Sequence, residues 1–178
     1  MTISIHQPNF FPHLPFFEKM RDSDIFVLLR YCQYEKGGYQ NRFFLNGWHT
    51  MSVNRGLEPI ISKRYINHAP DWNKIKSNLP QYDLSQFDDC ISEDLSFTNT
   101  HIIKRIAKLM NIRTSIFEDE PSEHTGTERL LYICKKYGAT TYLSGASGTK
   151  YMDTKIFERE GIEIKYQNSQ TRPILSVI

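Results

Sequence analysis

The N-terminal region carries the pattern of a β–α–β unit, which restricts the fold more than any other feature of the sequence. Ile3 and Ile5 begin a short apolar strand, and Pro8 ends it because proline has no N–H to donate to a neighbouring strand. The run Ile25–Leu29 is continuously apolar, as is typical of a parallel strand covered on both faces. Between them a helix is predicted, with Phe16, Phe17 and Met20 on its apolar face and Glu18, Lys19 and Arg21 on its polar face.

The rest of the chain repeats this alternation and adds a hairpin. Asn46-Gly47 between apolar runs predicts a β-hairpin with a type I′ turn. Residues 54–94 predict only a short helix that Asp71 caps and Pro80 ends. Further on, the sequence predicts a helix capped by Thr98 or Thr100, a strand over Thr114–Phe117, a helix capped by Thr127, a strand over Thr140–Leu143, a short helix capped by Asp153 and a strand over Ile162–Tyr166.

Such alternation predicts an α/β fold: a three-layer Rossmann-like parallel sheet with a small appended β-hairpin. The length of 178 residues suits one core, so we expect a single domain over residues 1–178. The 22 Lys and Arg nearly balance the 20 Asp and Glu, so no overall field recruits nucleic acid or a membrane.

The cysteines and the hydropathy of the sequence indicate in which cellular compartment the protein is expected. Cys32, Cys90 and Cys134 are widely spaced and form neither a CxxC pair nor a metal-ligand pattern. The N-terminus lacks a signal-peptide pattern, and no apolar run approaches the roughly 18 residues of a spanning helix. We therefore expect a reduced, cytoplasmic protein without membrane insertion or nucleic-acid partners, and the oligomeric state stays open.

Two loops follow strands of the predicted parallel sheet and should therefore share one rim. The first contains His6, Gln7 and Asn9, and an imidazole there suits an acid, a base or a phosphate donor; the alternative is a hydrogen-bonded loop histidine. The second, Ser144–Gly148, resembles a phosphate cradle because Gly145 and Gly148 permit close approach and Ser144 and Ser147 can donate. It lacks the P-loop spacing, and a plain flexible turn is the alternative.

Other polar segments are weaker candidates. Gln40, Asn41 and Arg42 offer planar donors for phosphate, carboxylate or sugar hydroxyls, with a solvated loop as the alternative. Glu128 and Arg129 lie at a predicted helix start, where a capping role is the common one. The acidic loop from Glu118 to Glu123 could hold Mg²⁺, although a solvated loop is the more frequent outcome.

Several blocks, in order along nearly the whole chain, resemble the WbqC-like family. They are His6–Pro12, Ser23–Val27, Gln33-Tyr34, Gln40–Arg42, Thr127–Leu130 and Tyr142–Gly145 continuing through Tyr151. Two features depart from the family pattern: His13-Leu14-Pro15 stands where other members tend to read Trp-Leu-Gly, and the sequence stops at Ile178 where longer members continue.

The resemblance implies a cytosolic bacterial protein associated with O-antigen and other surface-polysaccharide gene clusters. The family's polar blocks correspond to His6, Gln7, Asn9, Gln40, Asn41, Arg42, Glu128, Arg129, Ser144, Gly145 and Tyr151. A looser similarity to nucleotidylyltransferase-like folds lies in the histidine-bearing first loop and the late serine-bearing loop. The paired histidine motif of those folds is not intact, because Phe16 stands three residues after His13.

Together these observations predict a nucleotide- or sugar-nucleotide-dependent transferase in surface-polysaccharide biosynthesis, with acyl or aminoacyl transfer to an amino sugar as one such reaction. The expected cofactor is a nucleoside triphosphate or a nucleotide sugar, with Mg²⁺ as an option and no protein metal ligands assigned. Catalytic candidates are His6, Gln7, Asn9 and Glu128, and binding candidates are Gln40, Asn41, Arg42, Arg129, Ser144, Gly145, Ser147, Gly148 and Tyr151. The alternative is a non-catalytic nucleotide- or glycan-binding scaffold protein.

Overall fold

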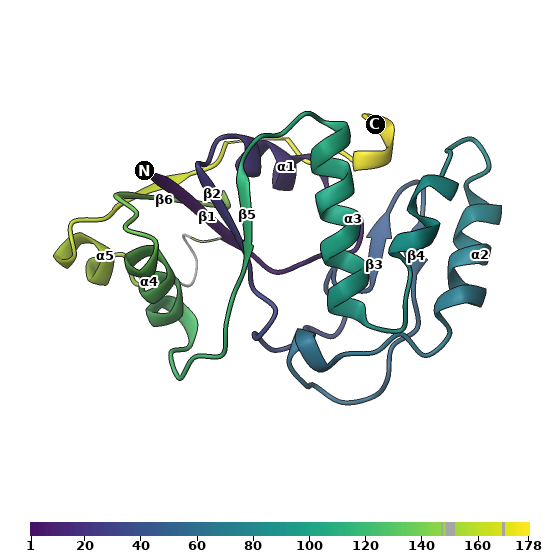
Figure 1. The fold of residues 1–178 in the computed structure, drawn as a ribbon, viewed down its shortest axis with the longest axis horizontal. Coiled ribbons are helices and arrows are strands. Elements are labelled where there is room, and N and C mark those ends of the chain that lie inside the picture. Colours follow the sequence, from purple (N-terminus) through teal and green to yellow (C-terminus); the bar gives the residue numbers. More distant parts are fainter. Residues whose placement is uncertain (147, 149–151, 169) are drawn as a thin grey trace.

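A computed structural model describes residues 1–146, 148, 152–168 and 170–178 (Figure 1). The elements in chain order are β1 (Thr2–His6), α1 (Leu14–Arg21), β2 (Ile25–Leu28), β3 (Arg42–Phe44), β4 (Trp48–Thr50), η1 (Ile60–Ser62), α2 (His68–Asn78), η2 (Ser85–Cys90), α3 (Leu95–Leu109), β5 (Ser115–Glu118), α4 (Gly126–Lys136), β6 (Thr141–Ser144), α5 (Lys155–Arg159), β7 (Glu163–Tyr166) and η4 (Ile174–Ser176). The predicted α/β class is confirmed.

The five-stranded sheet is parallel throughout, in the order β5-β2-β1-β6-β7. The chain thus builds outward from β1 in two directions, and the carboxyl ends of β1 and β6 form the point where the strand order reverses. The β1–β6 ladder joins Thr2 to Thr141 and Ile3 to Tyr142, whereas β1 and β2 stay paired as far as His6. Ligands of open parallel sheets bind at such a reversal point.

Helices cover both faces of the sheet, which gives the predicted three layers. Phe26 and Leu28 of β2 belong to a buried cluster shared with α1 and α3, whereas Val27 belongs to a second cluster with α4 and α5. This division follows from the pleat, because successive side chains of a strand point to opposite faces. Figure 1 shows α4 and α5 at one end of the molecule and α2 with the hairpin at the other.

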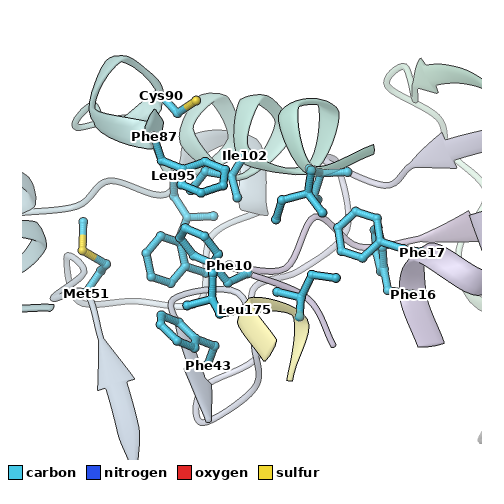
Figure 2. Close-up of a cluster of buried hydrophobic side chains, with 14 of the residues drawn as sticks. Phe10, Phe16, Phe17, Phe43, Met51, Phe87, Cys90, Leu95, Ile102 and Leu175 are labelled. Atoms are coloured by element: carbon cyan, nitrogen blue, oxygen red, sulfur yellow. The ribbon is translucent and has the colours of Figure 1, made fainter. Parts of the chain in front are cut away.

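The antiparallel β3–β4 hairpin is confirmed, but the predicted type I′ turn is not. Phe44 pairs with Trp48, so the loop has three residues, 45–47, and Asn46 and Gly47 have φ values of 54° and 152°. The hairpin is joined to the sheet region through the larger cluster. Figure 2 shows Phe43 of β3 in that cluster with Phe10, Ile102 of α3 and Leu175. Phe10 comes from the β1–α1 loop and is fully buried, so the loop that carries His6 and Asn9 is anchored by the core.

The starts of α2, α3 and α4 differ from the prediction. Helix α3 begins at Leu95, and the Asp94 carboxylate caps it by accepting the Phe97 N–H at 2.8 Å, whereas Thr98 and Thr100 are buried. Helix α2 begins at His68, and the Asp71 carboxylate accepts the Ser52 N–H at 2.6 Å. Asp94 thus caps its own helix, whereas Asp71 binds the backbone of a segment distant in the sequence.

Helix α4 begins at Gly126, after Thr125, so Thr127 lies within the helix and is not its cap as predicted. The Thr127 hydroxyl instead accepts the Asp153 N–H at 3.3 Å. In the part of the chain that the structure describes, no helix is both long and apolar enough to cross a membrane.

Candidate functional site

A pocket of about 350 Å³ lies at the carboxyl ends of β1 and β6, and we call it the switch-point pocket. Its lining combines several segments: His6 ends β1, Asn9 follows β1, Lys19 lies on α1, Tyr39 precedes the hairpin, Gly145 follows β6 and Gln167 follows β7. The structure therefore brings together the two loops that the sequence predicted to share a rim. Three of the predicted site residues, His6, Asn9 and Gly145, line this pocket.

His6 is half-buried at the end of β1. Its Nδ1 lies 2.9 Å from the carbonyl oxygen of Gln7, and its ring meets Phe16 edge-on with the centroids 4.9 Å apart. Burial, together with the nearby Lys19 ammonium, lowers the pKa of His6 to about 3. The ring is therefore neutral near pH 7. Because a carbonyl can only accept, the proton sits on Nδ1 and Nε2 remains an acceptor, so the base is the predicted role that this geometry favours.

Lys19 is the residue of this site that sequence reasoning missed. It was predicted on the polar face of its helix, but it is 2 % exposed. Its ammonium donates to the Ile5 carbonyl at 3.2 Å and lies 5.7 Å from the Phe26 ring centroid. The signal was the spacing, since Lys19 follows Phe16 by three residues and so shares its side of the helix.

The charge of the switch-point pocket depends on Lys19. Burial lowers the pKa of its amine to about 7. Among the described residues, no carboxylate lines the pocket and none pairs with Lys19. A buried amine without a carboxylate partner is unfavourable for folding, which makes Lys19 a candidate functional residue. The pocket therefore suits an anionic ligand or one rich in hydroxyls.

The loop after β6 is tightly built where the structure describes it. The Ser144 hydroxyl is buried and donates to the Gly145 carbonyl at 3.2 Å, and the Gly148 N–H donates to the same carbonyl at 2.9 Å. A Cβ at Gly148 would lie 2.1 Å from the Ser144 Oγ, whereas one at Gly145 would meet nothing within 4 Å. Gly148 is thus needed for packing, and Gly145 leaves space open to the pocket. Ser147 and Tyr151 lie outside the described residues.

We expect Gly148→Ala to lower the free energy of unfolding by about 1–2 kcal/mol, because the new methyl group overlaps the Ser144 hydroxyl. Adding Ser144→Ala removes that oxygen, so the double variant should recover most of the loss. Urea unfolding of the two single variants and the double variant measures the coupling. Equal loss in Gly148→Ala and in the double variant would contradict this packing.

Three of the remaining candidates, Gln7, Gln40 and Asn41, form hydrogen bonds with other protein groups. The buried Gln40 donates from Nε2 to the Gln7 side chain at 2.5 Å, which ties its loop to the His6 loop. Asn41 is also buried; it donates to the Met51 carbonyl at 2.7 Å and accepts from the Tyr34 hydroxyl at 2.9 Å. Gln7, Gln40 and Asn41 are thus engaged with protein groups, and any direct role with a ligand stays a prediction.

Arg42 begins β3 and lies outside the lining of the switch-point pocket. Its Nε donates to the Gly38 carbonyl at 3.2 Å, and an Nη donates to the Gly37 carbonyl. Its guanidinium carbon lies 4.0 Å from the centroid of the Trp48 ring. Its predicted role as a donor to phosphate, carboxylate or sugar hydroxyls stays a prediction, and the structure places it on the hairpin next to exposed aromatic rings.

Glu128 and Arg129, the two predicted site residues at the start of α4, lie in different environments. Glu128 is exposed, whereas Arg129 is 8 % exposed and forms an ion pair of 2.5 Å with Asp119. Neither lines the switch-point pocket. The Arg129 guanidinium also donates to the Glu120 carbonyl at 2.8 Å, and Asp119 accepts the Arg30 N–H at 2.6 Å. This pair therefore holds together the ends of β2 and β5 and the start of α4.

Glu118 and Glu120, two other acids considered for Mg²⁺, are paired with cations. Glu118 contacts Arg30 at 2.8 Å and Lys104 at 2.7 Å, and Glu120 contacts Lys136 at 2.6 Å. The described ranges of the chain contain no group of three or more His, Cys, Asp or Glu placed to hold a metal ion.

Comparison with known proteins gives one family and one distant relative. The model of the WbqC-like protein family matches residues 7–174. An uncharacterized protein of Mycobacterium tuberculosis is 23% identical over 186 residues, which cover 92% of this chain and 80% of the relative. No solved structure matches the chain. The matched region contains the whole lining of the switch-point pocket except His6.

Proposed function

The chain belongs to the WbqC-like protein family, and on this premise we propose that its switch-point pocket binds a phosphate-bearing small molecule, a nucleotide or a nucleotide sugar. We propose further that the protein transfers a group from this donor to an acceptor in the assembly of a bacterial surface polysaccharide. The observation that carries the proposal is the buried Lys19 amine, which lines the pocket without a carboxylate partner among the described residues.

A bound phosphate would supply the negatively charged partner that the Lys19 amine does not have among the described residues. An opposite charge within a few ångströms favours the protonated amine, so binding should raise the pKa of Lys19 from its value of about 7. The pocket also offers hydroxyl- and phosphate-binding groups in the side chains of Asn9 and Gln167 and space at Gly145. These groups come from three different loops, as in other ligand sites of parallel sheets.

In such a transfer, a hydroxyl or amine of the acceptor forms a bond to the transferred group while the bond from that group to the donor's phosphate breaks. The phosphate leaves with the electron pair, and the acceptor's proton goes to a base. The Lys19 ammonium would stabilise the departing phosphate, and the His6 Nε2 is a candidate for the base. Acyl or aminoacyl transfer to an amino sugar has this form when the donor is an acyl or aminoacyl nucleotide, in which the transferred group is bonded to the phosphate.

The surface-polysaccharide pathway comes from the family resemblance, and the cytoplasmic location rests on the same resemblance and on three unpaired cysteines. A second candidate function is non-catalytic binding of the same ligands in that pathway. It is favoured by the low pKa of His6, about 3, since so weak a base removes a proton slowly.

We expect nucleoside triphosphates or nucleotide sugars to raise the melting temperature, because a ligand at roughly 100 times its Kd stabilises the folded state by about 2.7 kcal/mol. Thermal unfolding with UTP and UDP-sugars, with and without Mg²⁺, is compared with the parent nucleosides, which lack phosphate. Gly145→Val should fill the pocket mouth without disturbing the fold, since its Cβ meets no atom within 4 Å. If the ligand raises the melting temperature of the native protein but not that of Gly145→Val, the result supports binding in the switch-point pocket.

Two outcomes separate the candidate functions. Binding followed by cleavage of the donor in the presence of amino-sugar acceptors supports the transferase, and recovery of the bound donor unchanged supports the non-catalytic role. Equal shifts from nucleosides and nucleotides, or no shift from either, would refute a phosphate site.

A further inference from the structure

Four aromatic rings run from the mouth of the switch-point pocket onto the hairpin, and we call them the aromatic strip: His13, Tyr39, Trp48 and Phe44. Neighbouring ring centroids are 5.5 Å apart from His13 to Tyr39, 5.7 Å from Tyr39 to Trp48 and 5.5 Å from Trp48 to Phe44. His13 and Tyr39 line the pocket itself. The strip is therefore a continuation of the pocket over the protein surface.

The strip keeps large apolar side chains in contact with water. Tyr39 is 43 % exposed, Phe44 is 45 % exposed and Trp48 is 48 % exposed. Isolated exposed rings are common, but adjacent ones that adjoin a pocket indicate a binding surface.

Trp48 is held in place before any ligand arrives. The Arg42 guanidinium lies over its ring at 4.0 Å, and the carbonyl oxygens of Gly37 and Gly38 fix that guanidinium in turn. A rigid exposed ring loses little conformational entropy on binding, so it is a favourable contact residue. Arg42 also has N–H groups beyond those two bonds, which can donate to hydroxyls at the edge of the strip.

We propose that the aromatic strip is a carbohydrate subsite that binds the sugar rings of the acceptor, and this inference rests on the proposed function of the switch-point pocket as the donor site. A pyranose ring has an apolar C–H face that stacks on aromatic rings and a rim of hydroxyls that needs donors such as Arg42. Several rings in succession fit an oligosaccharide, whereas a single nucleobase would cover only one or two of them.

Charge separates an oligosaccharide from a single-stranded nucleic acid, which also stacks on aromatic rings. Nucleic-acid grooves pair each stack of bases with several cations along the backbone. Arg42 places its guanidinium against the strip, whereas Arg172 contacts His13 through its backbone carbonyl, and the sequence balances 22 basic against 20 acidic residues. The strip therefore favours a neutral sugar chain.

The test uses the full chain on an array of bacterial oligosaccharides, together with Trp48→Ala and the control Phe97→Ala. Phe97 is an equally exposed ring, 43 % exposed, on α3 outside the strip. We expect binding of at least one linear oligosaccharide, weakened about 10-fold or more by Trp48→Ala and unchanged by Phe97→Ala. The bound oligosaccharide should also protect Trp48 from acrylamide quenching; the second tryptophan, Trp72, is 3 % exposed and contributes little.

The proposal is overturned if no oligosaccharide binds, if Trp48→Ala binds as well as the native chain, or if an oligothymidylate binds the strip instead. Thermal shifts with UDP-sugars are measured on the same variants. If UDP-sugars still raise the melting temperature of Trp48→Ala, the variant is folded and its donor pocket is intact. The proposed donor site is then supported independently of the oligosaccharide result. If the native chain does not bind nucleotides, that result would instead count against the proposed function.

Discussion

Replacing Lys19 by Met is expected to abolish most phosphate-dependent binding and also to stabilise the protein near neutral pH. A hydrogen-bonded charge contributes about 1.5–3 kcal/mol, so the affinity for nucleotides should fall about 10- to 100-fold. Met matches the unbranched shape of lysine and removes a charge that is 2 % exposed and has no carboxylate partner among the described residues. Burying such a charge is unfavourable, so we expect the free energy of unfolding at pH 7 to rise by about 1–3 kcal/mol.

The stability gained by Lys19→Met should decrease as the pH rises above 7. In the unfolded chain the Lys19 amine keeps its proton up to its ordinary pKa of 10.5, whereas burial lowers the pKa to about 7 in the folded protein. Between these values the unfolded state binds more protons, so the stability of the native chain rises with pH. The advantage of Lys19→Met is therefore largest at and below pH 7 and shrinks toward pH 10.5.

Urea unfolding from pH 6 to pH 10 and nucleotide titration measure the two effects. Lys74→Met is the matched control, because it removes an exposed lysine from α2 and should change neither. A destabilised Lys19→Met variant that binds nucleotides normally would show that the amine is structural.

Replacing Arg129 by Met should cause the largest loss of stability. The Arg129 guanidinium lies 2.5 Å from the Asp119 carboxylate, and the two side chains are 10% and 1% exposed. Removing one partner of a buried pair leaves an uncompensated charge, which costs about 3–5 kcal/mol. Thermal and urea unfolding measure the loss.

A double variant tests whether the stranded charge causes this loss. Asp119→Asn removes the charge and keeps the oxygen that accepts the Arg30 N–H, so Asp119→Asn with Arg129→Met should be more stable than Arg129→Met alone. Lys136→Met breaks only an exposed ion pair with Glu120 and should leave stability unchanged. A double variant no more stable than Arg129→Met would refute the explanation.

The regular elements could be predicted because local patterns determine them. The continuous apolar run became β2, and the turn at Asn46 and Gly47 formed the hairpin. Helix starts were less predictable, because Asp71 serves the backbone of Ser52, far from it in sequence, instead of its own helix. The strand order could not be predicted either, because no local sequence pattern determines that β6 pairs with β1.

The candidate site was predicted in part for the same reason. His6 ends a strand, Asn9 and Gly145 follow strands, and the geometry of a parallel sheet brings such residues to one edge. The burial of Lys19 depends on how a short helix packs, and the engagement of Gln40 and Asn41 depends on partners in other segments. Polar residues in a loop do not reveal whether they face a ligand or their own backbone.

The most direct test of the phosphate site is an NMR titration of the Lys19 side chain in protein labelled with ¹³C-lysine, with the signal assigned through Lys19→Met. The account predicts a midpoint near pH 7 in the free protein and a rise of about one unit or more with saturating pyrophosphate or UDP-sugar. A midpoint near 10.5 that no phosphate compound shifts would contradict it.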